Sequence, residues 1–116
     1  MTAPAIHVES ARRWSKLTLV EQLANVGSEV GRAIRAHERG QQSRRENAVT
    51  RALELFDLTA ADERWRGPRR REVLRAREEF CRLFYAPDVP PDSARGLSAY
   101  FLAFAVAARR RGFSTP

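Results

Sequence analysis

Apolar residues recur at steps of three and four along this chain, and no useful run of alternating polar and apolar residues is present. That spacing places apolar side chains on one face of a helix. The longest stripe consists of Leu19, Leu23, Val26, Val30, Ala33 and His37. The sequence therefore predicts an all-α fold, an antiparallel four-helix bundle with helices over about 18–39, 43–57, 68–85 and 93–111.

Capping patterns mark where the first two helices begin and end. Thr18 and Glu21 form a capping box, and Gly40 provides a stop at the other end of the helix. Ser43 and Glu46 have the spacing of a second capping box. A linker of about three residues between the two helices predicts antiparallel packing.

The longest loop is expected between the second and third helices, from residue 59 to residue 67. A short helical turn started by Thr59 with Asp62 is expected within it. Pro68 suits the first position of the third helix, where its missing N–H is not needed.

The length of 116 residues fits one domain, assigned here to residues 14–112, with an irregular or flexible arm over 1–13 and a tail over 113–116. Cys81 is the only cysteine and is expected to be a small core residue. The N-terminal residues lack the basic start and long apolar stretch of a secretory signal. We therefore expect a cytoplasmic protein.

The chain carries a formal net charge of +7 and a sequence pI near 11.1, which favours an anionic partner. Lys16 is the only lysine, and the other 20 of the 21 basic residues are arginines. A coding bias toward arginine is an alternative explanation for this total charge. Such a bias does not explain why the arginines cluster.

Five arginines fall within residues 64–71, RWRGPRRR, where the third helix is expected to begin. Cations at the positive end of a helix typically cost up to about 1 kcal/mol each, so an anionic ligand is expected to compensate. A tryptophan among cations suits single-stranded nucleic acid, through base stacking and phosphate contact. The predicted binding residues are Arg64, Trp65, Arg66, Arg69, Arg70, Arg71 and Arg75.

A structural interpretation of the same cluster stays open. Arg75 can pair with Glu79, and Glu78 with Arg82, because residues four apart are neighbours on a helix. Trp65 would then close the end of the bundle.

The fourth helix is apolar nearly all round, since Ser98 is the only polar residue from 97 to 108. Twelve residues are too few to cross a membrane, which needs about twenty. Such a helix is expected to be buried centrally or at a contact with another subunit or protein. The predicted interface residues, which imply a homo-oligomer or a protein partner, are Gly27, Gly31, Tyr100, Phe101 and Phe104.

Arg32 and His37 have the Arg-x4-His spacing of HEPN ribonucleases, in which the histidine would act as general acid or base. The position after the arginine is Ala33, where that family usually has a polar residue. Since His37 continues the apolar stripe, a histidine at the edge of the core is the alternative. No metal-ligand spacing, phosphate loop or nucleophile motif is present, so a non-enzymatic protein without cofactor or metal is expected.

Three segments carry a resemblance to a known family: residues 14–30, WSKLTLVEQLANVGSEV, residues 51–59, RALELFDLT, and residues 74–78, LRARE. The chain resembles a small bacterial family of helical proteins that has no assigned function. In architecture it is also similar to the basic four-helix accessory proteins of diversity-generating retroelements and to ribosomal RNA intervening-sequence proteins. That likeness is architectural only, because fold alone does not determine function. From the arginine cluster we expect a non-enzymatic, self-associating bundle that binds RNA or single-stranded DNA as an accessory to another protein.

Overall fold

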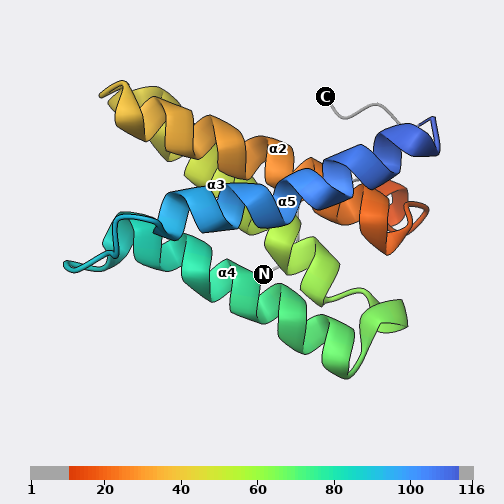
Figure 1. The fold of residues 1–116 in the computed structure, drawn as a ribbon. Helices are drawn as coiled ribbons and strands as arrows, with labels where there is room; N and C mark the ends of the chain where they lie inside the picture. Colours follow the sequence, from red (N-terminus) through yellow and green to blue (C-terminus); the bar gives the residue numbers. More distant parts are fainter. Residues whose placement is uncertain (1–10, 113–116) are drawn as a thin grey trace, which may run out of the picture.

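The computed structural model describes residues 11–112, and the residues predicted as arm and tail at 1–10 and 113–116 lie outside this range. Helices are the only regular elements over residues 11–112, which confirms the all-α prediction (Figure 1). Residues 11–14 are helical and are therefore not part of an irregular arm. The elements that follow are α2 (Leu19–Glu38), α3 (Gln42–Ala60), the 3-10 turn η1 (Glu63–Trp65), α4 (Pro68–Tyr85) and α5 (Ser93–Arg110).

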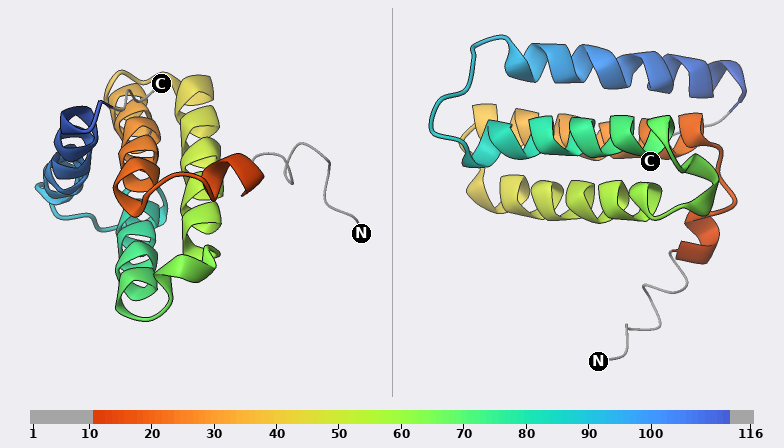
Figure 2. Two further views of the ribbon diagram at one scale, coloured as in Figure 1. Left: turned by 90° about the vertical axis from the view of Figure 1, so that its right-hand side faces the viewer. Right: turned by 90° about the horizontal axis from the view of Figure 1, so that it is seen from below.

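The four long helices form a bundle with α2 in its middle. Helix α2 packs against α3 on one side and α5 on the other, while α4 contacts α3 and α5 (Figure 2). Figure 1 shows α5 crossing α2 obliquely, and Figure 2 shows α5 as an outer layer. Of the two positions expected for this helix, central burial within the chain is therefore wrong, and a contact with another subunit or protein stays a prediction.

Three phenylalanines from three helices form the centre of the core. Phe56 of α3 lies with its ring centroid 5.7 Å from Phe80 of α4 and 5.9 Å from Phe101 of α5. The predicted inward faces are confirmed at the buried residues Leu23, Val26, Val30, Ala33, Val49, Ala52, Val73 and Ala76. His37 is exposed and rests its ring against Phe84, so the stripe leaves the core there.

The α2–α3 turn follows a Schellman motif. The Gly40 N–H donates to the carbonyl of His37, the Gln41 N–H donates to that of Ala36, and Gly40 has a φ of 66°. This pattern is the usual reason for glycine just beyond a helix C-terminus. It makes Gln41 the N-cap of α3, so the predicted Ser43 capping box is wrong.

Helix α3 continues to Ala60, beyond the predicted end near residue 57. Thr59 is therefore helical and does not start a separate turn. Its hydroxyl donates to the carbonyl of Leu55 and accepts a hydrogen bond from the indole of Trp14, which favours helix over loop. Asp62 caps the short turn η1 instead, accepting from the N–H of Arg64.

Gly27 lies where α2 and α5 cross. A Cβ placed on Gly27 would lie 2.7 Å from the Cβ of Phe101, closer than real side-chain contacts. Gly31 differs, because its nearest neighbour would be the flexible guanidinium of Arg35 at 3.0 Å. Close helix approach therefore explains Gly27 but not Gly31.

Candidate nucleic-acid interface

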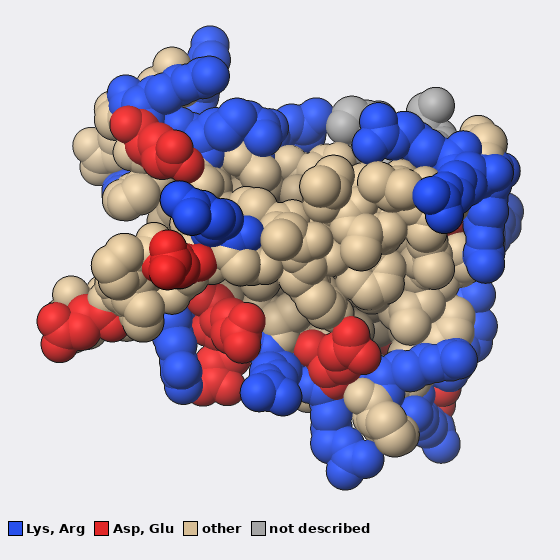
Figure 3. Space-filling view, viewed as in Figure 1, with Lys and Arg blue, Asp and Glu red and all other residues tan. Residues whose placement is uncertain are grey.

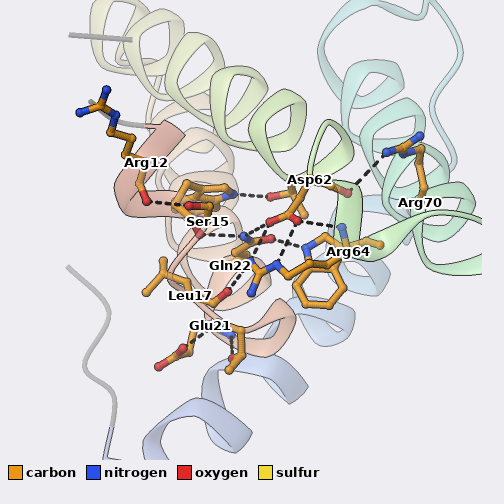
Figure 4. A network of polar contacts seen from close by, with 12 residues as sticks. Arg12, Ser15, Leu17, Glu21, Gln22, Asp62, Arg64 and Arg70 are labelled. Atoms are coloured by element: carbon orange, nitrogen blue, oxygen red, sulfur yellow. Dashed lines mark hydrogen bonds and ion pairs between the residues drawn. The ribbon is translucent and has the colours of Figure 1, made fainter. Parts of the chain in front are cut away.

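Two arginines of the cluster, residues 64–71, pair with carboxylates that precede it in the chain, and Figure 4 shows one of these pairs, Arg64 with Asp62. The guanidinium of Arg64 donates to both carboxylate oxygens of Asp62, at 3.0 Å from Nε and 2.7 Å from Nη2. It also donates to the carbonyl of Leu17. The Arg64 hydrogen bonds hold the pKa of Asp62 at about 2, and a further bond from Gln22 acts in the same direction against the effect of burial. Arg64 therefore links the α2 entry loop to η1.

Trp65 is a core residue and does not present its ring to a ligand. Only 8% of it is exposed, and its indole N–H donates to the side-chain oxygen of Gln22 at 2.8 Å. The amide nitrogen of Gln22, which is completely buried, donates to the carbonyl of Trp14 and to Asp62. The structure thus supports the interpretation that Trp65 closes one end of the bundle, and its ring is not open to base stacking.

Of the other arginines in the cluster, two have polar partners among residues 11–112 and two do not. Arg66 forms an ion pair with Glu63, and the half-buried Arg70 donates from Nη2 to the carbonyl of Asp62. Arg69 lies with its guanidinium carbon 5.8 Å from the centroid of the Trp65 ring. Arg69 and Arg71 are exposed, as is Arg75, which follows the cluster on α4.

This arrangement removes much of the electrostatic argument for a ligand at the start of α4. Asp62 and Glu63 compensate two of the cations, and Gly67 and Pro68 provide the N-cap and first helical position. The Glu78–Arg82 pair predicted on α4 is present, while Arg77 pairs with Asp57 of α3. The exposed cations that remain on this surface lie at positions 69, 71 and 75.

A second basic surface, which the sequence interpretation missed, lies between α2 and α3. We call it the α2–α3 groove; its volume is about 440 Å³, and it is lined by Glu29, Arg32, Arg35, Ala36, Arg39, Gln41, Arg44, Asn47, Ala48 and Arg51. Five of these residues are arginines and one is acidic. The buried Ala36 and Ala48 supply its small side chains, which leave space between the rows of longer residues.

The arginines of this groove form two rows. Positions 32, 35 and 39 lie on one face of α2, and positions 44 and 51 lie on one face of α3, because steps of three, four and seven return to the same side of a helix. Each row extends over seven residues, or about 10 Å at 1.5 Å per residue. The antiparallel packing of α2 and α3 places the rows on opposite walls.

Charge on the groove is only partly compensated. Arg32 pairs with Glu29, and Arg51 pairs with Glu54. Among residues 11–112, Arg35, Arg39 and Arg44 form no ion pair with a carboxylate, and all three are exposed. Arg35 also lines a smaller hollow between α2 and α5, with Gly31 and Leu102. Exposed guanidinium groups without carboxylate partners that line one concave surface suit phosphate oxygens, which they can bind through paired N–H donors.

Arg32 and His37 line different grooves of this chain. Arg32 lines the α2–α3 groove, whereas His37 lies in a separate groove of about 730 Å³ with Phe84, the 89–91 loop and the start of α5. Five residues along a helix turn the side chain through about 500°, so the two point roughly 140° apart. The Nδ1 of His37 faces the guanidinium of Arg45 at 3.4 Å.

Most of the residues predicted to form an interface with another chain make contacts within this chain. Phe101 is buried, and Gly27 packs against it. Tyr100 and Phe104 are half-buried and meet edge to face, with their ring centroids 5.2 Å apart. The Tyr100 hydroxyl donates to Glu72 of α4 at 2.6 Å, and burial followed by this hydrogen bond raises the Tyr100 pKa.

Within the described range, no helix is long and apolar enough to span a membrane. Residues 11–112 also contain no group of three or more histidine, cysteine or acidic residues placed to hold a metal ion. Searches against protein-family models, curated proteins and solved structures found no match to this chain.

Proposed function

We propose that this chain is a non-enzymatic binding protein for single-stranded nucleic acid, RNA or DNA, and that the α2–α3 groove is its binding surface. The observation that carries the proposal is that Arg35, Arg39 and Arg44 line one groove and form no ion pair with a carboxylate of residues 11–112. Phosphate contacts supply most of the affinity in sequence-independent binding.

The shape of the groove favours one strand over a duplex. Proteins that read a duplex insert a protruding helix or ribbon into a DNA groove, whereas a concave basic channel follows a single backbone. The α2–α3 groove is concave, and Ala36 and Ala48 are the only apolar residues among those that line it.

The chemistry of the lining predicts a binding mode without base stacking. No aromatic residue lines the groove, and Trp65 is buried elsewhere. We therefore expect affinity to depend strongly on salt and little on base identity, because phosphate contacts carry no sequence information.

The test compares two variants that lose the same charge on different surfaces. The groove variant is Arg35→Gln/Arg39→Gln/Arg44→Gln, and its matched control on α4 is Arg69→Gln/Arg71→Gln/Arg75→Gln. All six side chains belong to exposed residues, so both variants are expected to fold. Affinity is measured by fluorescence anisotropy with a labelled single-stranded RNA and the DNA of the same sequence.

We expect the groove variant to lose at least about tenfold in affinity, and its salt slope to fall by about two, since each lost contact with single-stranded phosphate contributes roughly 0.7. The control should change affinity much less. Equal losses in both variants would indicate binding by net charge alone. A larger loss of affinity in the control would indicate that nucleic acid binds at the start of α4 and not in the α2–α3 groove.

Protein association through α5 is a second candidate function. The observation that favours it is the exposure of Leu102 and Val106, at 57% and 36%, on the outer face of this helix. Apolar residues exposed in a row on a surface helix are typical of a contact with another helix.

A further inference from the structure

The outer face of α5 carries a row of exposed residues with alternating steps of three and four. We call it the α5 seam, and it consists of Asp92, Arg95, Ala99, Leu102, Val106 and Arg109, all exposed. The buried residues of the same helix, Leu97, Phe101 and Ala108, lie on the opposite side. Figure 3 shows an uncharged surface across the middle of the face on which α5 lies.

The steps of the α5 seam are those of coiled-coil contact positions. Alternating intervals of three and four residues keep one line of side chains facing a neighbouring helix. In the described part of the chain, no element covers this line, since α5 contacts α2 and α4 through its inner face (Figure 2). The seam is therefore arranged for a helix that the single chain does not supply.

We propose that the α5 seam pairs antiparallel with the α5 seam of a second copy of this chain. In the proposed register, Ala99 of each copy faces Leu102 of the other, so a small residue always meets a large one. Arg95 of each copy then faces Val106 of the other, and Asp92 faces Arg109. The pattern is self-complementary, as a twofold interface requires.

Charge selects this register and this direction. Asp92 of each copy faces Arg109 of the other, which places an opposite-charge pair at both ends of the contact. A parallel pair would instead set Asp92 against Asp92 and Arg109 against Arg109. Within the chain Asp92 lies 3.9 Å from Arg95, with both side chains 87% exposed, so its carboxylate is accessible to a second copy.

Gly96 lies beside the α5 seam, one position along the helix from Arg95, and provides a separate observation. It lies inside α5, where glycine costs about 1 kcal/mol relative to alanine, yet a Cβ placed on it would meet no atom within 4 Å. Packing within the chain therefore does not explain this glycine. Exposed Gly96, Ala99 and Ala103 would let two α5 axes approach to about 8 Å, the lower end of helix packing distances.

The expected dimer is weak and depends on concentration. One helix pair buries less than the roughly 800 Å² per partner of a standard interface, so we expect a dissociation constant on the order of micromolar. None of the six seam residues lines the α2–α3 groove. Leu102 of the seam and Arg35 of the groove line a common hollow between α2 and α5, so the two surfaces are neighbours there.

The test is sedimentation equilibrium of the full chain, free of nucleic acid, from about 1 to 500 µM, a range that brackets micromolar affinity. Leu102→Glu should raise the dissociation constant of the dimer at least about tenfold, because dimer formation would then bury a charged side chain at residue 102 of each copy. The matched control is Leu74→Glu on α4, which is also exposed, at 45%, and should leave self-association unchanged. A wild-type chain that stays monomeric throughout, or a Leu102→Glu dimer of unchanged affinity, would overturn the proposal.

A charge exchange tests the register. Asp92→Arg and Arg109→Asp should each weaken the dimer severalfold, because each sets like charges against each other at both ends. The double variant Asp92→Arg/Arg109→Asp should restore the affinity to near the wild-type value. A double variant as weak as the single ones would contradict the proposed register.

Discussion

The two glycines of α2 should respond to alanine with opposite signs. Both Gly27 and Gly31 lie inside a helix, where replacing glycine by alanine stabilises by about 1 kcal/mol if space allows. At Gly27 the new methyl group would lie 2.7 Å from the Cβ of Phe101 and 3.1 Å from its Cγ. These atoms lie close to the α5 backbone, so relief requires the two helices to separate.

The magnitude follows from the balance of two terms. Overpacking a core contact costs about 1–3 kcal/mol, and an approach of 2.7 Å between two Cβ atoms belongs in the upper part of that range, at about 2–3 kcal/mol. After the gain of about 1 kcal/mol in helix propensity, Gly27→Ala should destabilise by about 1–2 kcal/mol. Gly31→Ala meets only the guanidinium of Arg35, which can rotate away, and should stabilise by about 0.5–1 kcal/mol. The free energies of unfolding of the two variants should therefore differ by about 1.5–3 kcal/mol.

Urea denaturation followed by circular dichroism measures this difference at one fixed protein concentration, because association would otherwise shift the midpoint. The denaturant slope should stay the same in both variants, which would assign the change to the folded state. If Gly27→Ala were as stable as Gly31→Ala, the close crossing of α2 and α5 would be refuted.

Three further outcomes follow from the polar network and from the separation of the two grooves. The lowered pKa of Asp62 stabilises the fold above pH about 4 and this stability is lost as the pH falls through about 2, so Asp62→Asn should cost about 1–2 kcal/mol near neutral pH and progressively less as the pH falls to about 2 and below. Urea titrations at several pH values check this, and a difference independent of pH would contradict it. Trp65→Phe leaves the buried Gln22 oxygen without its donor and should cost about 1–3 kcal/mol, with RNA affinity in the anisotropy assay within twofold of wild type. Since Arg32 and His37 line different grooves, RNA incubated with excess protein should stay intact on a denaturing gel, and cleavage abolished by His37→Ala would overturn this expectation.

Local patterns were enough to predict much of the fold. Thr18, Gly40 and Pro68 act on neighbouring backbone groups, and the structure places each at the predicted helix end. The capping box at Ser43 was a wrong prediction from a pattern of the same kind. The Schellman turn at Gly40 makes Gln41 the N-cap of α3, so Ser43 already lies inside the helix and cannot cap it.

The buried polar network could not be predicted from local patterns, because its hydrogen bonds join residues far apart in the sequence. Gln22 and Trp65 are 43 positions apart in the chain, and nothing near either residue indicates their hydrogen bond. The cluster at residues 64–71 therefore had the composition of a binding site, although part of it is structural. Its neighbours Asp62 and Glu63 were visible in the sequence, but their pairing with Arg64 and Arg66 was not determined by it.

The α2–α3 groove could have been found from the sequence. Positions 32, 35 and 39 share a helix face, as do positions 44 and 51, and the short turn at Gly40 brings the two helices together. Charge density along the chain favoured residues 64–71 instead. Helical spacing across two packed helices indicates a basic surface better than a run of consecutive arginines does.

Arginine footprinting tests the binding surface most directly. The protein is treated with phenylglyoxal, which modifies exposed guanidinium groups, with and without a saturating single-stranded RNA, and the modified positions are read by mass spectrometry. The proposed function predicts protection of Arg35, Arg39 and Arg44, while Arg69 and Arg75 stay reactive. Protection confined to the α4 arginines, or equal at every exposed arginine, would contradict binding in the α2–α3 groove.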